Sequence, residues 1–169
     1  MILTRHTLDH IEVRADAREL LGLAVPYGQP TEIGSYIESL ARGAFAGIDA
    51  GSVPLTAAHP RDGAELPIGV SAELRESEAG WHGTWRVSRT QLGDEILALA
   101  SDGVPLGLSI GFIPELDQWN RDRTRVVRQR ASLDHIAVVR SPAYASARVA
   151  AIRSHPEHAP LLHLARLHR

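Results

Sequence analysis

Residues 107–112 have the sequence GLSIGF, which predicts a β-strand that carries a serine hydroxyl. The run follows the turn signal DGVP at 102–105, and Ser109 stands in it between small and apolar residues. A serine in such a strand is more often an ordinary residue whose hydroxyl bonds neighbouring backbone groups. Evidence that Ser109 is a nucleophile must therefore come from the segments before and after it.

Around this run the chain predicts short strands and few helices. Turn residues separate the strand-compatible runs, and a polar turn is expected at 116–122 and a basic edge strand, kept soluble by its charge, at 124–130. Thr90 is placed to cap a helix that ends near Gly103, and the sequence SPA at 141–143 opens a second helix to about Arg153. A brief helical turn is expected at 42–49, and one or two opening strands are expected within 11–26. Further strands are expected at 36–40, 53–58, 66–75, 81–87, 107–114, 124–130 and 131–139.

Length and composition indicate one soluble globular domain. The chain has 169 residues, 44% of them hydrophobic and 22% charged, and its formal charge of −2 gives no electrostatic case for nucleic acid. It has no cysteine, no apolar run of membrane-spanning length and no signal-peptide pattern, so we expect an intracellular protein without disulfides or a membrane anchor. We expect an N-terminal arm at 1–10, a folded domain at 11–153 and a tail at 154–169.

The histidines narrow the search for a partner to Ser109. Six of the nine lie in the terminal arms, and His82 falls on the polar face of a strand, which leaves His59 and His135 inside the fold. His59 follows a strand and precedes Pro60, which favours an extended backbone at a loop edge. His135 lies in the apolar run 133–139, where a period of two places it and Asp134 on opposite faces, so that both cannot point into one site.

These residue types fit a serine hydrolase. A serine hydroxyl is almost wholly protonated at neutral pH and needs a base within hydrogen-bond reach, and a third group then fixes the orientation of that base. Ser109, His59 and His135 can fill the three roles. Each histidine can equally be an ordinary hydrogen-bonded residue of a strand.

Several blocks together resemble the prohead, or capsid maturation, protease of tailed phages of the HK97 type. They are GLAVPY at 22–27, LTAAH at 55–59, IGV at 68–70, LALASDG at 97–103, LSIGF at 108–112, LDHIAVV at 133–139 and SPAY at 141–144. The resemblance covers roughly residues 15–150. It implies an α+β, mainly β, fold related to the herpesvirus assembly proteases: a single β-barrel of mostly antiparallel strands flanked by a few short helices.

The same resemblance implies a serine endopeptidase that processes capsid and scaffold proteins. Ser109 matches the nucleophile and His59 the general base. Many relatives have a carboxylate where His135 stands, whereas the herpesvirus enzymes have a second histidine, so the chain resembles the Ser-His-His variant. A nearby Asp is the alternative third member. The implied partners are the major capsid protein with its scaffold segment, with self-cleavage and a homodimer as further expectations. The implied location is the prohead in the host cytoplasm, or a bacterial cytoplasm where a prophage encodes the protein, and no cofactor or metal is expected.

The sequence is also compatible with two other functions. One is a catalytically silent capsid-assembly or scaffold-binding barrel, and the other is a hydrolase with a metal held by His59, His135 and either Asp62 or Asp134. Oxyanion donors are expected among backbone N–H groups near Ser109 or before Pro142, with Arg140 as a further candidate.

Overall fold

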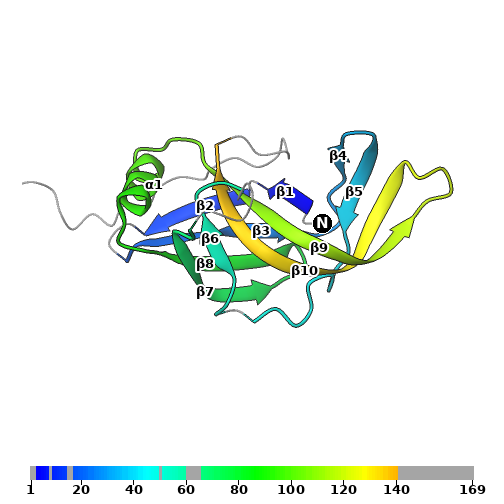
Figure 1. Ribbon diagram of the computed structural model, residues 1–169, viewed down its shortest axis with the longest axis horizontal. Coiled ribbons are helices and arrows are strands. Elements are labelled where there is room, and N and C mark those ends of the chain that lie inside the picture. The colour runs from blue at the N-terminus through cyan, green and yellow to red at the C-terminus, as the bar shows by residue number, and fades with distance from the viewer. Residues whose placement is uncertain (1–2, 8, 15–16, 50, 60–65, 141–169) are drawn as a thin grey trace, which may run out of the picture.

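The computed structural model describes residues 3–7, 9–14, 17–49, 51–59 and 66–140. Within these residues ten strands form one sheet, and one helix lies at an end of it (Figure 1). The elements in chain order are β1 (Leu3–Thr7), β2 (Asp9–Arg14), β3 (Glu19–Pro26), β4 (Thr31–Ile33), β5 (Tyr36–Leu40), β6 (Pro54–Thr56), β7 (Gly69–Glu76), β8 (Gly80–Val87), α1 (Gln91–Ser101), β9 (Gly107–Trp119) and β10 (Arg125–Val139).

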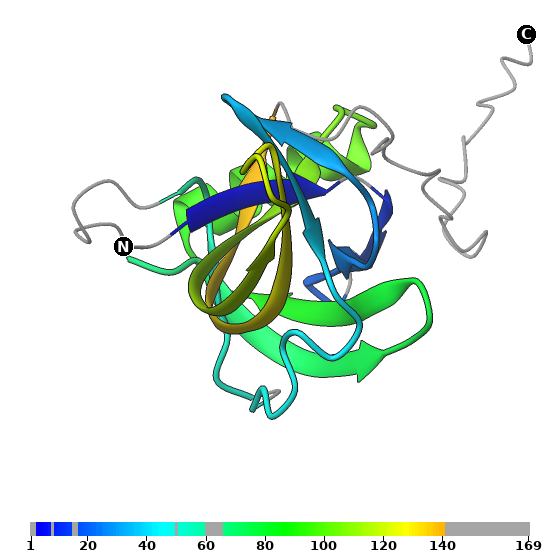
Figure 2. The same ribbon diagram turned by 90° about the vertical axis from the view of Figure 1, so that its right-hand side faces the viewer.

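The sheet is curled, and its strand order is β1-β9-β10-β6-β7-β8-β3-β2. The view along the long axis shows the strands bending around a common interior (Figure 2). The predicted mainly β class is confirmed, but in the described part of the chain no ladder joins the two edge strands β1 and β2, and α1 is the one helix. The described sheet is thus a half-barrel, and the helix predicted at 141–153 lies outside the described residues.

The long strand β10 connects the two halves of the sheet. One of its edges is paired antiparallel with β9, and the other is paired parallel with β5 at Arg125–Arg128 and with β6 at Ile136–Ala137. The segment 124–130 was predicted to be an edge strand, and that prediction is wrong because β5 covers its second edge. The predicted polar turn at 116–122 is also misplaced: β9 continues to Trp119, and the turn occupies 120–124.

A buried ion pair explains how the basic strand comes to lie inside the sheet. Arg128 has a side chain only 4% exposed, and its Nε donates to Glu38 Oε2 at 2.6 Å. Its Nη1 donates to Asp117 Oδ2 at 2.5 Å. Glu38 comes from β5 and Asp117 from β9, so one guanidinium links three neighbouring strands. Two carboxylates therefore neutralise the charge of Arg128, which the sequence pattern predicted to be exposed to solvent.

The helix α1 confirms the sequence prediction. The hydroxyl of Thr90 accepts from the Gly93 N–H at 3.1 Å, which satisfies one of the free donors at the helix start. Ile96, Leu97 and Ala100 are buried, as the three- and four-residue spacing requires, while Leu92 and Leu99 remain partly exposed.

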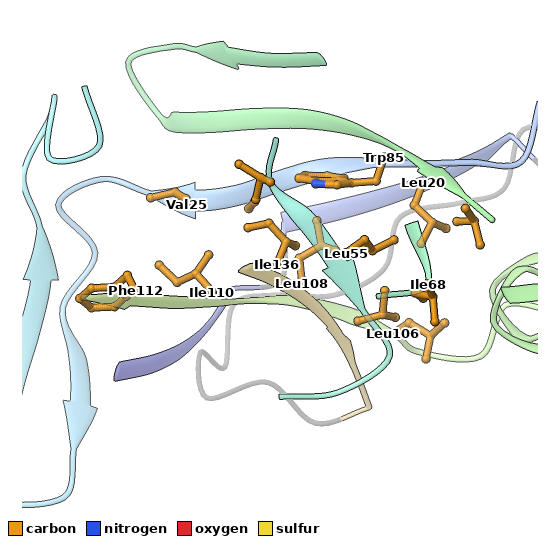
Figure 3. Packing of buried hydrophobic residues seen from close by; sticks show 14 of the residues in the cluster. Leu20, Val25, Leu55, Ile68, Trp85, Leu106, Leu108, Ile110, Phe112 and Ile136 are labelled. Atoms are coloured by element: carbon orange, nitrogen blue, oxygen red, sulfur yellow. The ribbon is translucent and has the colours of Figure 1, made fainter. Parts of the chain in front are cut away.

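The core lies between the β9–β10 hairpin and the strands β3 and β8. Leu108, Ile110 and Phe112 project from β9 toward Trp85 of β8 and Val25 of β3 (Figure 3). Because side chains alternate along a strand, these three residues place Ser109 and Gly111 on the opposite face of β9. The packing of the core therefore determines the direction in which the serine points.

The ion pair of Arg128 generates a prediction about stability. Glu38→Gln is expected to lower the free energy of unfolding in urea by about 3 kcal/mol or more, because it leaves a buried guanidinium with one of its two carboxylates. The matched control is Glu115→Gln, which removes the exposed ion pair to Arg130 and is expected to cost less than about 1 kcal/mol. Equal losses in the two variants would contradict the assignment of Arg128 as the link between the three strands.

Candidate active site

Ser109 lies in the buried part of β9, where the ladder with β10 determines its neighbours. In this register Ser109 is opposite Ala137, and Gly111 is opposite His135. Ser109 is 0% exposed and His135 is 4% exposed. The strand pairing therefore brings His135 to the same face as Ser109, one pleat away along the ladder.

A β-bulge changes the expected positions of Asp134 and His135. The pairing advances from Leu133 opposite Phe112 to His135 opposite Gly111, so Asp134 is an extra residue without a partner of its own on β9. The period-two prediction that Asp134 and His135 point away from each other is wrong. In the structure, Asp134 Oδ2 lies 2.7 Å from Nδ1 of His135.

His59 reaches the site from the loop that follows β6. β6 runs parallel to β10, with Leu55 opposite Ile136 and Thr56 opposite Ala137. The buried hydroxyl of Thr56 donates to the carbonyl oxygen of Ala58 at 2.6 Å and so closes the turn that leads into His59. β6 ends at Thr56 and is thus shorter than the strand predicted at 53–58, but it leads into His59 as the sequence predicted.

Three side chains from distant parts of the sequence form one line of hydrogen bonds. Nε2 of His59 is hydrogen-bonded to Oγ of Ser109. Nδ1 of His59 lies 2.9 Å from Nε2 of His135, and the two rings meet edge to face with centroids 5.2 Å apart. His59 is half-buried, so the line starts at a buried hydroxyl and continues through two imidazoles.

Gly111 leaves the space that the His135 ring occupies. A Cβ built on Gly111 would lie within 2.7 Å of Cε1, Nδ1 and Nε2 of that ring, well inside van der Waals contact. The backbone φ of Gly111 is not in the left-handed region, so the absence of a side chain matters here for space and not for conformational freedom. The second glycine of GLSIGF is therefore part of the site.

The described residues do not favour the metal alternative. Among residues 17–49, 51–59 and 66–140 no three His, Asp or Glu side chains are grouped as metal ligands. Both ring nitrogens of His135 have partners, one in Asp134 and one in His59, so neither nitrogen is directed at a cation. Asp62 lies outside the described residues.

The remaining sequence predictions fall outside the line of hydrogen bonds. His82 is exposed on β8, as expected for the polar face of that strand. Arg140 follows β10 with an exposed side chain, and Pro142 and the tail at 154–169 lie outside the described residues. The oxyanion donors stay a prediction.

The one helix in the described segments, α1, is not long and apolar enough to cross a membrane.

Comparisons with known proteins agree with the resemblance stated above. A profile of the family described as caudovirus prohead serine protease matches residues 6–160. The solved structure of the bacteriophage T4 capsid assembly protease, gp21, matches with a TM-score of 0.58 at 10% sequence identity, over 82% of this chain and 96% of that chain. At this identity the likeness concerns the fold alone. The search of curated proteins finds no match.

The contact between Gly111 and His135 generates a prediction about the site. Gly111→Ala is expected to lower both stability and hydrolytic activity, the latter by about tenfold or more, because the added methyl group displaces the His135 ring in a buried place. In the double variant Gly111→Ala/His135→Ala the ring is gone, so it is expected to be as stable as His135→Ala alone. Thermal unfolding of the three variants checks this.

The matched control is Gly51→Ala, whose new Cβ meets no atom closer than Asp49 Oδ1 at 3.8 Å. It is expected to retain stability and activity. A Gly111→Ala protein that behaves like Gly51→Ala would contradict the steric role of Gly111.

Proposed function

Because the chain belongs to the family of caudovirus prohead serine proteases, we propose that its catalytic triad is Ser109, His59 and His135. The observation that supports this proposal is the line of hydrogen bonds from the Ser109 hydroxyl through both nitrogens of His59 to His135. A nucleophile, a base and a group that orients the base are what a serine protease requires.

In the proposed mechanism each residue has one role. Oγ of Ser109 attacks the carbonyl carbon of the scissile peptide bond while Nε2 of His59 takes the hydroxyl proton. The same nitrogen then gives that proton to the leaving amine, which produces an acyl-enzyme. Water attacks the acyl-enzyme with His59 again as the base, and Ser109 recovers its proton.

His135 holds His59 in the orientation that this proton transfer needs. A neutral imidazole can accept the Nδ1–H of His59, but it stabilises the protonated form of His59 less than a carboxylate would. We therefore expect a modest turnover number. Such a rate is sufficient for an enzyme enclosed with its substrate, because confinement raises the effective concentration.

The proposed substrates are the major capsid protein and its scaffold segment, cut inside the prohead in the host cytoplasm. Self-cleavage and a homodimer are part of the proposal. We propose a protease domain at 11–153 and a tail at 154–169. The segment 1–10, expected from the sequence as an arm, adds β1 and the start of β2 to the sheet of this domain. We also keep the closed barrel as part of the proposal, because β1 contacts β3 as well as pairing with β9 and so brings the two ends of the sheet together.

The serine mechanism predicts the effect of removing the nucleophile. Ser109→Ala is expected to abolish cleavage of a co-expressed capsid precursor, a loss on the order of 10⁶-fold for a serine protease, without loss of the folded state. Gel analysis of the precursor and circular dichroism of the variant check the two parts. Retained processing would exclude the serine mechanism.

The same assay separates the alternatives. A fluorophosphonate should label the native chain at Ser109 and fail to label Ser109→Ala, and a chelator should leave cleavage unchanged. Loss of cleavage in a chelator with recovery on adding zinc would instead favour the metal hydrolase. A native chain that neither cuts the precursor nor takes up the label would favour the silent assembly protein.

A second prediction tests the role of His135. His135→Ala is expected to lower kcat/KM by about 10²- to 10³-fold, because His59 loses the group that orients it. His135→Glu is expected to retain more activity than His135→Ala, since a carboxylate can accept the same hydrogen bond. A fully active His135→Ala beside a folded but inactive His135→Glu would show that the role assigned to His135 is wrong.

A further inference from the structure

The line of hydrogen bonds continues beyond the three triad residues. Nδ1 of His135, the nitrogen that faces away from His59, lies 2.7 Å from Oδ2 of Asp134. The side chain of Asp134 is 41% exposed, whereas that of His135 is 5% exposed. A carboxylate at the surface therefore forms the outer end of a line whose inner end is the buried Ser109.

The carboxylate of Asp134 determines the direction of every hydrogen bond in the line. An aspartate carboxylate can only accept, so Nδ1 of His135 must carry a proton and donate it. In a neutral imidazole the other nitrogen then has a free lone pair, so Nε2 of His135 accepts from Nδ1–H of His59. Nε2 of His59 is in turn left to accept from the Ser109 hydroxyl.

Without this partner the line has more than one arrangement. Two neutral imidazoles joined by one hydrogen bond are also satisfied with Nε2–H of His135 donating to Nδ1 of His59. In that arrangement Nε2 of His59 carries the proton and cannot act as a base toward Ser109. A serine protease in the wrong tautomer loses most of its activity, so the choice between the two arrangements matters for catalysis.

We propose that Asp134 is a positioning residue, which fixes His135 as the Nδ1–H tautomer and thereby leaves Nε2 of His59 free to accept the Ser109 proton. This inference rests on the proposed triad. Asp134 also supplies the negative charge that a neutral His135 lacks, and it acts on His59 through His135. Its partial exposure weakens that charge by solvent screening, so its effect is smaller than that of a carboxylate bound directly to the base.

The β-bulge is what allows consecutive residues to act together. In a regular strand Asp134 and His135 would point to opposite faces of the sheet. The shift in pairing between Leu133 and His135 re-aims Asp134 toward the ring of its neighbour. Bulges often have this use beside active sites, where they change the direction of one side chain.

The test compares Asp134→Ala, Asp134→Asn and Glu115→Ala in the full chain. Asp134→Ala is expected to lower kcat on the order of tenfold with little change in KM, because the bound substrate meets a base in mixed tautomers. Asp134→Asn can still accept from Nδ1–H through its amide oxygen, so it should recover part of that loss. Glu115→Ala is the matched control: its side chain is 39% exposed in an ion pair to Arg130, and it should leave kcat unchanged.

A spectroscopic measurement separates positioning from a general structural effect. Nitrogen-15 shifts of the imidazoles should show His135 protonated at Nδ1 in the native chain and in Asp134→Asn, and a mixture of tautomers in Asp134→Ala. Unchanged kcat and an unchanged His135 tautomer in Asp134→Ala would overturn the inference. Failure of the proposed triad and failure of the Asp134 role give different results. An active Ser109→Ala rejects the triad itself. An inactive Ser109→Ala beside a fully active Asp134→Ala rejects only the role of Asp134.

Discussion

The antiparallel ladder between β9 and β10 is the constraint on which the rest of the structure depends. Its register places Ile110 opposite Ile136 on the face that packs against Trp85, and it places Gly111 opposite His135 on the other face. One set of strand pairs therefore builds the core and the candidate active site together. A shift of the register by one residue would exchange the two faces, so the apolar packing of the core also holds the serine and the histidine in place.

The sequence was sufficient for the parts of this arrangement that follow a regular period. Alternation and turn residues predicted the strand of Ser109, the helix after Thr90 and the histidine at the end of a strand, and the structure confirms all three. The choice of His59 and His135 came from position in the chain and from the family resemblance. The structure adds that the two side chains meet each other and the serine, which no spacing in a sequence can show because strand pairing is non-local.

The predictions about 124–130 and about Asp134 were wrong because strand pairing overrides a local pattern. The basic run 124–130 has the pattern of an exposed edge strand, but Glu38 and Asp117 make it possible to bury Arg128, and β5 then pairs with it. Asp134 breaks the period of two because a bulge adds a residue to β10. Gly111 gave no chemical signal at all, since its contribution is the volume that it leaves to the His135 ring. Departures from regular patterns are expected at functional sites, where geometry takes precedence over local preference.

The use of two histidines, His59 and His135, also avoids the burial of a permanently charged carboxylate beside Ser109. Ser109 and His135 are almost completely shielded from water, and an isolated carboxylate at that depth would lose its hydration at a considerable cost in free energy. A neutral imidazole avoids this cost because it carries no charge, and in the proposed mechanism the proton taken from Ser109 goes to His59. In the line formed by Ser109, His59, His135 and Asp134 the permanent charge stands at the end that water reaches, and two imidazoles connect it to the buried nucleophile. A Ser-His-His site with an aspartate at its outer end can therefore keep a defined proton arrangement without a fully buried charge.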